Sequence, residues 1–228
     1  PLCKLLLVIT ISAFGSSETQ TLARERRIKS RMDSASMSTI GHGAAKILVE
    51  FLEVAITSIV FVKGIYPSGA FERARYRNVV VQRSLHPQLS QYIQSTCTSL
   101  LPFIQNGLVE RVAVIFYGIK DDPIERFIFK LETKSLCAST MEQTGDLQSS
   151  LSQFLIDISV SESRTKQLPN DCRWEITVYF RSLPERDADL WLPTKSRQWD
   201  RLPVITPVKS LSNGLMGLQL YIEHQDKC

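Results

Sequence analysis

The chain has 228 residues, of which 43% are hydrophobic and 22% are charged, a balance that is typical of a globular domain and excludes wholesale disorder. The formal net charge of +4 lies in residues 1–31, which carry six basic and two acidic side chains, whereas residues 32–228 carry 21 of each. Residues 32–228 therefore have no net charge and lack the broad positive surface that binds nucleic-acid phosphates. If the protein acts at DNA, we expect another protein to recruit it.

Residues 1–40 form a leader that differs from the rest of the chain. The apolar run 5–14 follows a lysine and precedes small residues, a pattern that is typical of a secretory signal peptide and too short for a membrane-spanning helix. Two interpretations are open: a secreted protein, or a stretch that is disordered or absent from the native protein, with Met32 or Met37 as the true start. The second is favoured because nothing downstream has the pattern of a secreted domain. The basic run 24–31 fits a nuclear-import signal as well as solvated charge.

The first regular element after the leader is a long helix over residues 44–63. Apolar residues cover most of its circumference, which is typical of a helix inside a core, and two glutamates and a lysine argue against a membrane span. A second helix is expected to begin near Ser84 or Pro87 and to end at the Asn-Gly pair 106–107, with a kink at Pro102.

Strand patterns flank a third helix. The runs 109–119 and 124–132 enclose an Asp-Asp-Pro turn and predict a hairpin, and apolar residues recur at helical spacing over 145–160. Residues 173–182 alternate between apolar and polar side chains, which predicts a strand covered on one face, and residues 215–223 repeat the pattern. Together these elements predict an α+β domain in which three helices pack on a mainly antiparallel sheet.

The stretch 183–209 has a different character. It holds four prolines, Trp191 and Trp199, and shows little periodicity. A connection of this length inside a domain is usually functional or mobile, and this one is too apolar for a plain linker.

No pattern of residues points to catalysis or to a metal. His42, His86 and His224 lie away from cysteine or acidic partners at ligand spacing, and no phosphate-binding loop or nucleophile motif occurs. The five cysteines are odd in number and lack a C-x-x-C pair, which is typical of reduced thiols in the cytosol or nucleus. The sequence therefore predicts a binding protein without a cofactor, although an enzyme whose catalytic groups meet only in space would escape such a search.

Short segments along the chain carry a family resemblance: Val49–Ile56, Ile65–Phe71, Val81–Gln82, His86–Leu89, Gln91–Gln94, Val109–Val112, Ile158–Val160, Pro207–Lys209 and Leu218–Glu223. With these segments the sequence resembles the HORMA-domain family over about residues 44–224. It is most similar to the branch that provides the non-catalytic subunit of translesion DNA polymerase zeta, also called mitotic-arrest-deficient 2B.

The resemblance implies a HORMA domain over residues 41–228, with a core over 41–182 and a C-terminal safety belt over 183–228 that closes on a partner's peptide. It implies an adaptor without catalytic activity or cofactor, nuclear and cytoplasmic, that joins the catalytic subunit of DNA polymerase zeta to the deoxycytidyl-transferase scaffold polymerase when damaged templates are copied. The same belt implies a second candidate, a cell-cycle or checkpoint adaptor that binds an activator of the anaphase-promoting complex.

The resemblance also assigns roles to individual residues. Tyr92 and Trp191 match positions that hold the polymerase peptide, and Ile205, Gln219 and Tyr221 match positions that face the scaffold polymerase. Each has an alternative from local pattern: Tyr92 fits the apolar core face of its helix, and tyrosine on the outer face of a strand is common.

Two departures from the family pattern change what is expected. Ser152 stands where the branch often has an arginine that supports dimers between HORMA domains, so dimerisation by that route is not expected. The belt differs slightly in length, which leaves Trp199 as the alternative to Trp191 for the peptide anchor.

Overall fold

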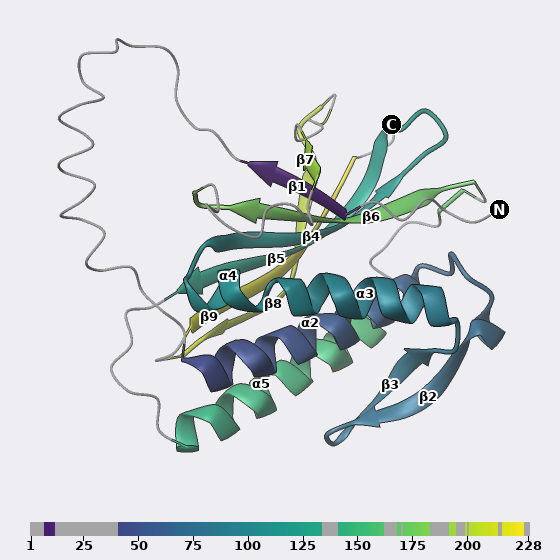
Figure 1. The fold of residues 1–228 in the computed structure, drawn as a ribbon. Helices are drawn as coiled ribbons and strands as arrows, with labels where there is room; N and C mark the ends of the chain where they lie inside the picture. The colour runs from purple at the N-terminus through teal and green to yellow at the C-terminus, as the bar shows by residue number, and fades with distance from the viewer. Residues whose placement is uncertain are drawn as a thin grey trace, which may run out of the picture.

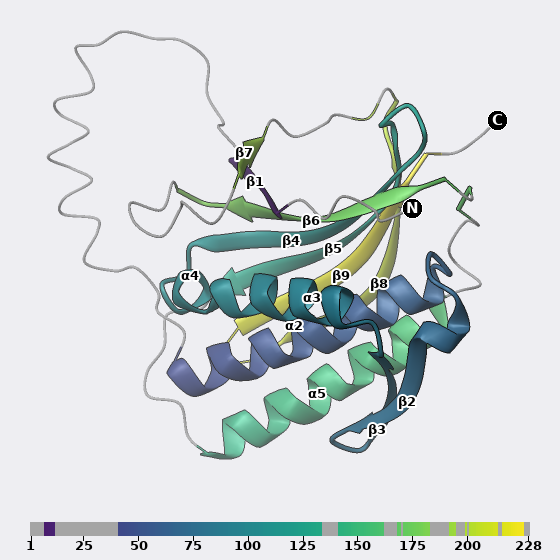
Figure 2. The same ribbon diagram turned by 45° about the vertical axis from the view of Figure 1, so that its right-hand side comes forward.

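The fold is a large twisted sheet with helices on one face (Figures 1 and 2). It is seen in a computed structural model, which describes residues 7–11, 41–133, 141–161, 168–169, 171–182, 192–194, 199, 201–213 and 216–225. The α-helices are α2 (His42–Val62), α3 (Pro87–Ser99), α4 (Leu101–Gln105) and α5 (Met141–Ser159), and the 3-10 helix η2 covers Ser68–Ala70. The strands are β1 (Leu7–Ile11), β2 (Phe71–Tyr76), β3 (Val79–Ser84), β4 (Val109–Tyr117), β5 (Pro123–Thr133), β6 (Arg173–Phe180), β7 (Leu192–Thr194), β8 (Val204–Ser212) and β9 (Met216–His224).

Strand order in the sheet, within the described ranges, is β7-β1-β6-β4-β5-β9-β8. β4, β5, β6, β8 and β9 pair antiparallel, whereas β1 is parallel to both of its neighbours. β2 and β3 form a separate hairpin that packs against the helices and not in the sheet (Figure 2). The predicted α+β architecture of three helices on a mainly antiparallel sheet is confirmed.

The core lies between the sheet and α2, which is sandwiched by α3 and α5 (Figure 1). The ring of Phe51 on α2 is fully buried and meets Phe129 of β5 and Phe154 of α5 edge to face, with centroids 6.0 and 5.9 Å apart. Each such aromatic side chain stabilises the fold by about 1.5–3 kcal/mol through burial alone. Because α2 contacts other elements on several sides, apolar residues are needed around most of its circumference.

The second predicted helix is in fact two helices. α3 ends at Ser99 and α4 begins at Leu101, because Pro102 lacks the N–H that a continuous helix would use and its ring crowds the preceding turn. Gly107 then ends the segment with a φ of +65°, a conformation that glycine adopts without steric cost. The predicted bend at Pro102 is therefore a complete break.

The prediction for β6 was wrong in one respect, because both faces of the strand are covered. Glu175 and Thr177, predicted to face solvent, are only 8% and 1% exposed. A second apolar cluster covers that face of the sheet, made of Ala113, Ile115, Tyr117 and Ile128 with Tyr179 and Tyr221 packed against it. The carboxylate of Glu175 accepts a hydrogen bond of 2.6 Å from the hydroxyl of Tyr117, so the buried acid has a partner.

The strands β1, β2, β3, β7 and β8 were not predicted. β8 begins inside the stretch predicted to be irregular and extends three residues beyond it, and its Pro207 stands where the pairing with β9 shifts register. An edge strand tolerates such a residue because one side of its backbone needs no partner in the ladder. β2 was missed because charged residues interrupt its apolar pattern, and two of them, Arg73 and Arg75, are exposed.

Candidate functional site

One edge of the sheet is built from segments far apart in the sequence. β6 pairs on one side with β4 and on the other with β1, with Leu7 opposite Ile176 and Ile11 opposite Phe180. β7 pairs with β1 and not with β6, with Val8 opposite Leu192. β1 thus lies between β6 and β7 (Figure 1), and we call this position the β6–β7 slot.

Tyr92 lies under the β6–β7 slot. Its hydroxyl accepts a hydrogen bond of 3.3 Å from the backbone N–H of Ile176, and its ring packs edge to face against Trp174, with centroids 5.7 Å apart. Ile176 is the residue opposite Leu7, the first residue of β1. α3 therefore places Tyr92 beside β6, next to the residue at which its pairing with β1 begins. The ring of Tyr92 lies in the core, and its hydroxyl is hydrogen-bonded to the backbone of β6.

The hydrogen bond of Tyr92 gives a direct prediction. Tyr92→Phe is expected to lower the free energy of unfolding by about 1 kcal/mol, because the N–H of Ile176 loses its acceptor. Urea unfolding measures the stability, and amide hydrogen exchange at Ile176 is expected to become faster. Unchanged exchange at Ile176 would contradict the role given to the hydroxyl.

The two tryptophans predicted to lie in a safety belt have different surroundings. Trp191 lies outside the described residues and directly precedes β7 in the chain. The indole N–H of Trp199 donates a hydrogen bond of 3.1 Å to Glu223, and the guanidinium of Arg126 lies 4.4 Å from the centre of its ring. Trp199 therefore packs against Arg126 of β5 and Glu223 of β9, and its role as the alternative peptide anchor stays a prediction.

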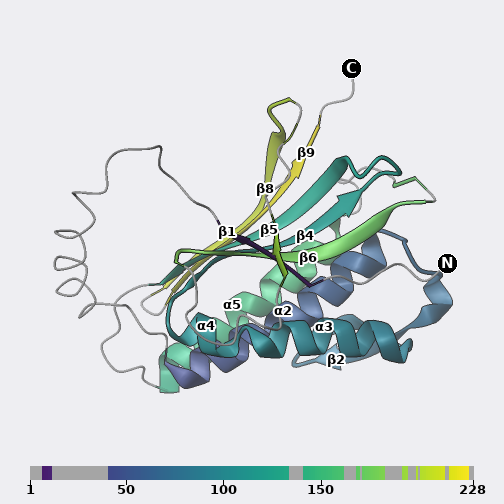
Figure 3. The same ribbon diagram turned by 45° about the horizontal axis from the view of Figure 1, so that its top comes forward.

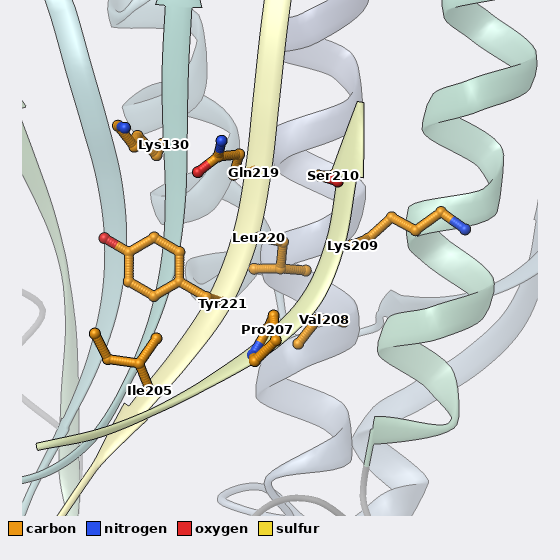
Figure 4. Close-up of a pocket in the computed structure, with 9 residues that line it drawn as sticks. All are labelled: Lys130, Ile205, Pro207, Val208, Lys209, Ser210, Gln219, Leu220 and Tyr221. Carbon is orange, nitrogen blue, oxygen red and sulfur yellow. The ribbon is translucent and has the colours of Figure 1, made fainter. Parts of the chain in front are cut away.

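At the opposite edge of the sheet the structure brings together the three residues expected to face a second partner. Ile205 on β8 and Gln219 and Tyr221 on β9 line one groove of about 880 Å³, which we call the hairpin groove (Figure 4). In Figure 4 they follow one another along the hairpin. The remaining lining residues, which sequence reasoning missed, are Lys130, Pro207, Val208, Lys209, Ser210 and Leu220.

The hairpin groove combines exposed apolar surface with fixed polar groups. The side chain of Ile205 is 59% exposed, and the neighbouring Leu202 is 96% exposed. Burial raises the pKa of the Tyr221 phenol, while the nearby Arg111 guanidinium works in the opposite direction. Tyr221 therefore stays protonated at neutral pH and offers an O–H donor beside an apolar surface, a combination that is common where proteins bind one another.

The hairpin groove is anchored to the helical layer. Lys209 of β8 forms a salt bridge of 3.2 Å with Asp157 of α5, and its side chain points toward that helix in Figure 4. Ser152 lies on the same helix, where its hydroxyl donates to the carbonyl of Gln148. This hydroxyl therefore makes a hydrogen bond within its own helix.

The two sites lie on opposite edges of one sheet. β6 stands at one side of the β4–β5 pair, and β9 and β8 stand at the other (Figure 3). Two partners bound at these edges would not overlap, since two strands, β4 and β5, separate β6 from the hairpin of β9 and β8.

The described residues contain no cluster of three or more histidine, cysteine or acidic side chains that could hold a metal ion. Within the same ranges, no helix has the length and apolar content needed to cross a bilayer. Cys97 is fully buried, and this burial raises the pKa of its thiol well above the usual range, so it is not a reactive nucleophile.

Known proteins with similar sequences point to the family that the fold suggests. The HORMA domain family matches residues 44–194. The chain is 53% identical to the DNA polymerase zeta processivity subunit of Arabidopsis thaliana, over 86% of this chain and 90% of that protein. It is 33% identical to the mitotic spindle assembly checkpoint protein MAD2B of Danio rerio, over 81% of this chain and 92% of the relative.

Solved structures share the fold. A chain of the mitotic checkpoint complex superposes with a TM-score of 0.71 at 20% identity, over 81% of this chain and 99% of that one. HTP-2 of C. elegans, bound to a HIM-3 closure motif, superposes with a TM-score of 0.63 at 10% identity, over 83% of this chain and 94% of that one. The chain belongs to the HORMA-domain family, among the non-catalytic relatives that include the processivity subunit of DNA polymerase zeta and MAD2B.

Proposed function

We propose that this protein is the adaptor subunit of DNA polymerase zeta. In this proposal it clamps a peptide of the catalytic subunit, which we call the client peptide, in the β6–β7 slot. It also presents the hairpin groove to the deoxycytidyl-transferase scaffold polymerase. Such an adaptor works in the nucleus, where damaged templates are copied.

The proposal that the protein clamps a client peptide rests on one observation, the pairing of strands around the β6–β7 slot. The edge of β6 accepts a strand from outside the matched domain, and β7 covers that strand from the other side. Addition of a strand to a sheet edge is a general way to bind a peptide, because the main chain supplies hydrogen bonds and alternate side chains supply specificity. HTP-2, which shares the fold, is bound to a closure motif in its solved structure, and this favours peptide binding by the present chain as well.

The bridging half rests on the hairpin groove. It combines an exposed apolar residue, Ile205, with the polar groups of Gln219 and Tyr221, and further exposed apolar side chains, Leu202 and Val204, precede it in the chain. Apolar side chains rimmed by polar ones are typical of a protein-binding surface. The 53% identity to a processivity subunit of polymerase zeta favours a polymerase as the partner.

A second candidate function follows from the likeness to MAD2B, which carries a spindle-checkpoint name. In that case the β6–β7 slot holds a peptide from an activator of the anaphase-promoting complex. Because both functions use one slot, direct competition between the two peptides separates them.

The test of the clamping half is fluorescence anisotropy with a labelled peptide of the Arabidopsis thaliana polymerase zeta catalytic subunit, with an activator peptide as competitor. We expect tight, slowly dissociating binding, since a strand held between two others leaves only after both rows of hydrogen bonds break. Displacement at low concentrations of the activator peptide favours the checkpoint function. Absence of polymerase-peptide binding by folded protein would refute the polymerase function.

Ile205→Asp tests the bridging half. The substitution is expected to weaken binding of the scaffold polymerase at least about tenfold, because a carboxylate replaces an exposed apolar contact in the groove. Affinity for the client peptide is expected to stay the same, since the slot lies at the other edge of the sheet. Val80→Asp is the matched control, because Val80 is similarly exposed, at 55%, on the separate β2–β3 hairpin. Equal scaffold affinity in both variants would refute the assignment.

A further inference from the structure

The β6–β7 slot has the width of one strand. Neighbouring strands of a sheet lie about 4.8 Å apart, so β6 and β7, as next-nearest neighbours, lie roughly 10 Å apart. β7 is only three residues long, includes Pro193, and pairs with β1 through the register Val8–Leu192, Ile9–Pro193 and Thr10–Thr194. Its place in the sheet therefore depends on a strand that lies between it and β6.

The strand that fills the slot comes from the leader. β1 lies well before residue 44, where the match to the HORMA domain begins, and 29 residues separate it from Gly41. A parallel pair needs a long connection, and β1 and β6 are joined through most of the chain. In its topology β1 is thus equivalent to a bound peptide that happens to be tethered to the domain.

The sequence of β1 suits this position. Leu7–Ile11 reads Leu-Val-Ile-Thr-Ile, with four β-branched residues in five, no charge and no proline. β-branched residues have a high preference for strands, and a segment without charges enters a position between two other strands without the large cost of burying a charge. The run that the sequence suggested as a signal-peptide core therefore has a second use within the fold.

We infer that residues 7–11 are an intramolecular ligand of the β6–β7 slot, which competes with the client peptide and holds the protein in a self-occupied state. The inference rests on the proposed clamping function, because it assumes that β1 and the client peptide bind at the same site. The client peptide gains access when β1 leaves, and removal of the leader converts the protein to its receptive form.

The expected size of the competition follows from effective concentration. A tethered strand acts at an effective concentration on the order of 1 mM. If the same segment as a free peptide binds with a Kd on the order of 0.1 mM, the slot is about 90% self-occupied and the apparent client affinity falls about tenfold. Tethering alone is thus sufficient to make a weak ligand a strong competitor.

The test compares four proteins: the full chain, a variant that lacks residues 1–36, Ile9→Pro and Leu22→Pro. Proline removes a backbone donor and is not accepted in a strand paired on both sides, so Ile9→Pro expels β1 without shortening the chain. Leu22→Pro is the matched control, because it places the same substitution in the leader outside β1. Anisotropy of the labelled catalytic-subunit peptide measures affinity, and hydrogen exchange of the free proteins measures protection of the β6 amides.

We expect the truncated variant and Ile9→Pro to bind the peptide about tenfold more tightly than the full chain and Leu22→Pro. In the absence of peptide, the β6 amides of the first two should exchange faster. Equal exchange and equal affinity in all four proteins would overturn the inference while leaving the clamping function intact. Faster β6 exchange in Ile9→Pro with no peptide binding by any of the four would instead refute the clamping function and support the self-occupied slot.

Discussion

Lys63→Met is expected to lower the free energy of unfolding by about 3–5 kcal/mol, because it leaves a buried carboxylate without its counter-ion. The ammonium of Lys63, just after the end of α2, lies 2.5 Å from the carboxylate of Glu125 on β5, and the two side chains are 1% and 0% exposed. The charge also lies 5.8 Å from the centre of the Phe116 ring. Burial lowers the pKa of Lys63, and the neighbouring Glu125 counteracts that shift.

Urea unfolding measures this effect, and two further variants define its origin. The double variant Lys63→Met, Glu125→Leu is expected to recover most of the loss, because apolar side chains replace both charges and none is left unpaired. Arg83→Met is the matched control: its ion pair with Glu72 is solvent-exposed, so the change is expected to stay below about 1 kcal/mol. A double variant no more stable than Lys63→Met would contradict the account.

Trp191→Ala is expected to weaken binding of the client peptide at least tenfold. The residue directly precedes β7, the strand that covers the β6–β7 slot, and full burial of an indole against a bound chain contributes about 2–3 kcal/mol. Every 1.4 kcal/mol corresponds to a tenfold change in Kd, and the loss should fall mainly on the dissociation rate. Anisotropy with the labelled peptide measures both quantities.

Trp199→Ala is the control within the same segment. Its indole contacts Arg126 of β5 and Glu223 of β9. The substitution is therefore expected to lower the melting temperature of the protein and to leave its affinity for the client peptide unchanged. If Trp199→Ala weakened binding of the client peptide and Trp191→Ala did not, the roles of the two residues would be exchanged.

Much of the helical layer was predictable because its signal is local. The apolar circumference of α2 predicted a core helix, and the alternation of β9 predicted that Leu218, Leu220 and Ile222 face inward while Gln219 faces out, as their burial confirms. β8 was missed because proline suppresses strand propensity, although an edge strand accepts it. β2 was missed because charged residues are tolerated on the exposed face of a hairpin.

The sequence by itself determined the fold class, the family and three of the residues that line the hairpin groove, Ile205, Gln219 and Tyr221, because periodicity and motif identity are properties of neighbouring residues. Only the tertiary structure decided which partners those residues have. It brought Tyr92 under β6, paired Lys63 with Glu125, packed Trp199 against Glu223 and placed Leu7–Ile11 between β6 and β7. These contacts join residues far apart in the chain, and a strand pattern specifies that a segment will pair but not which edge it will find.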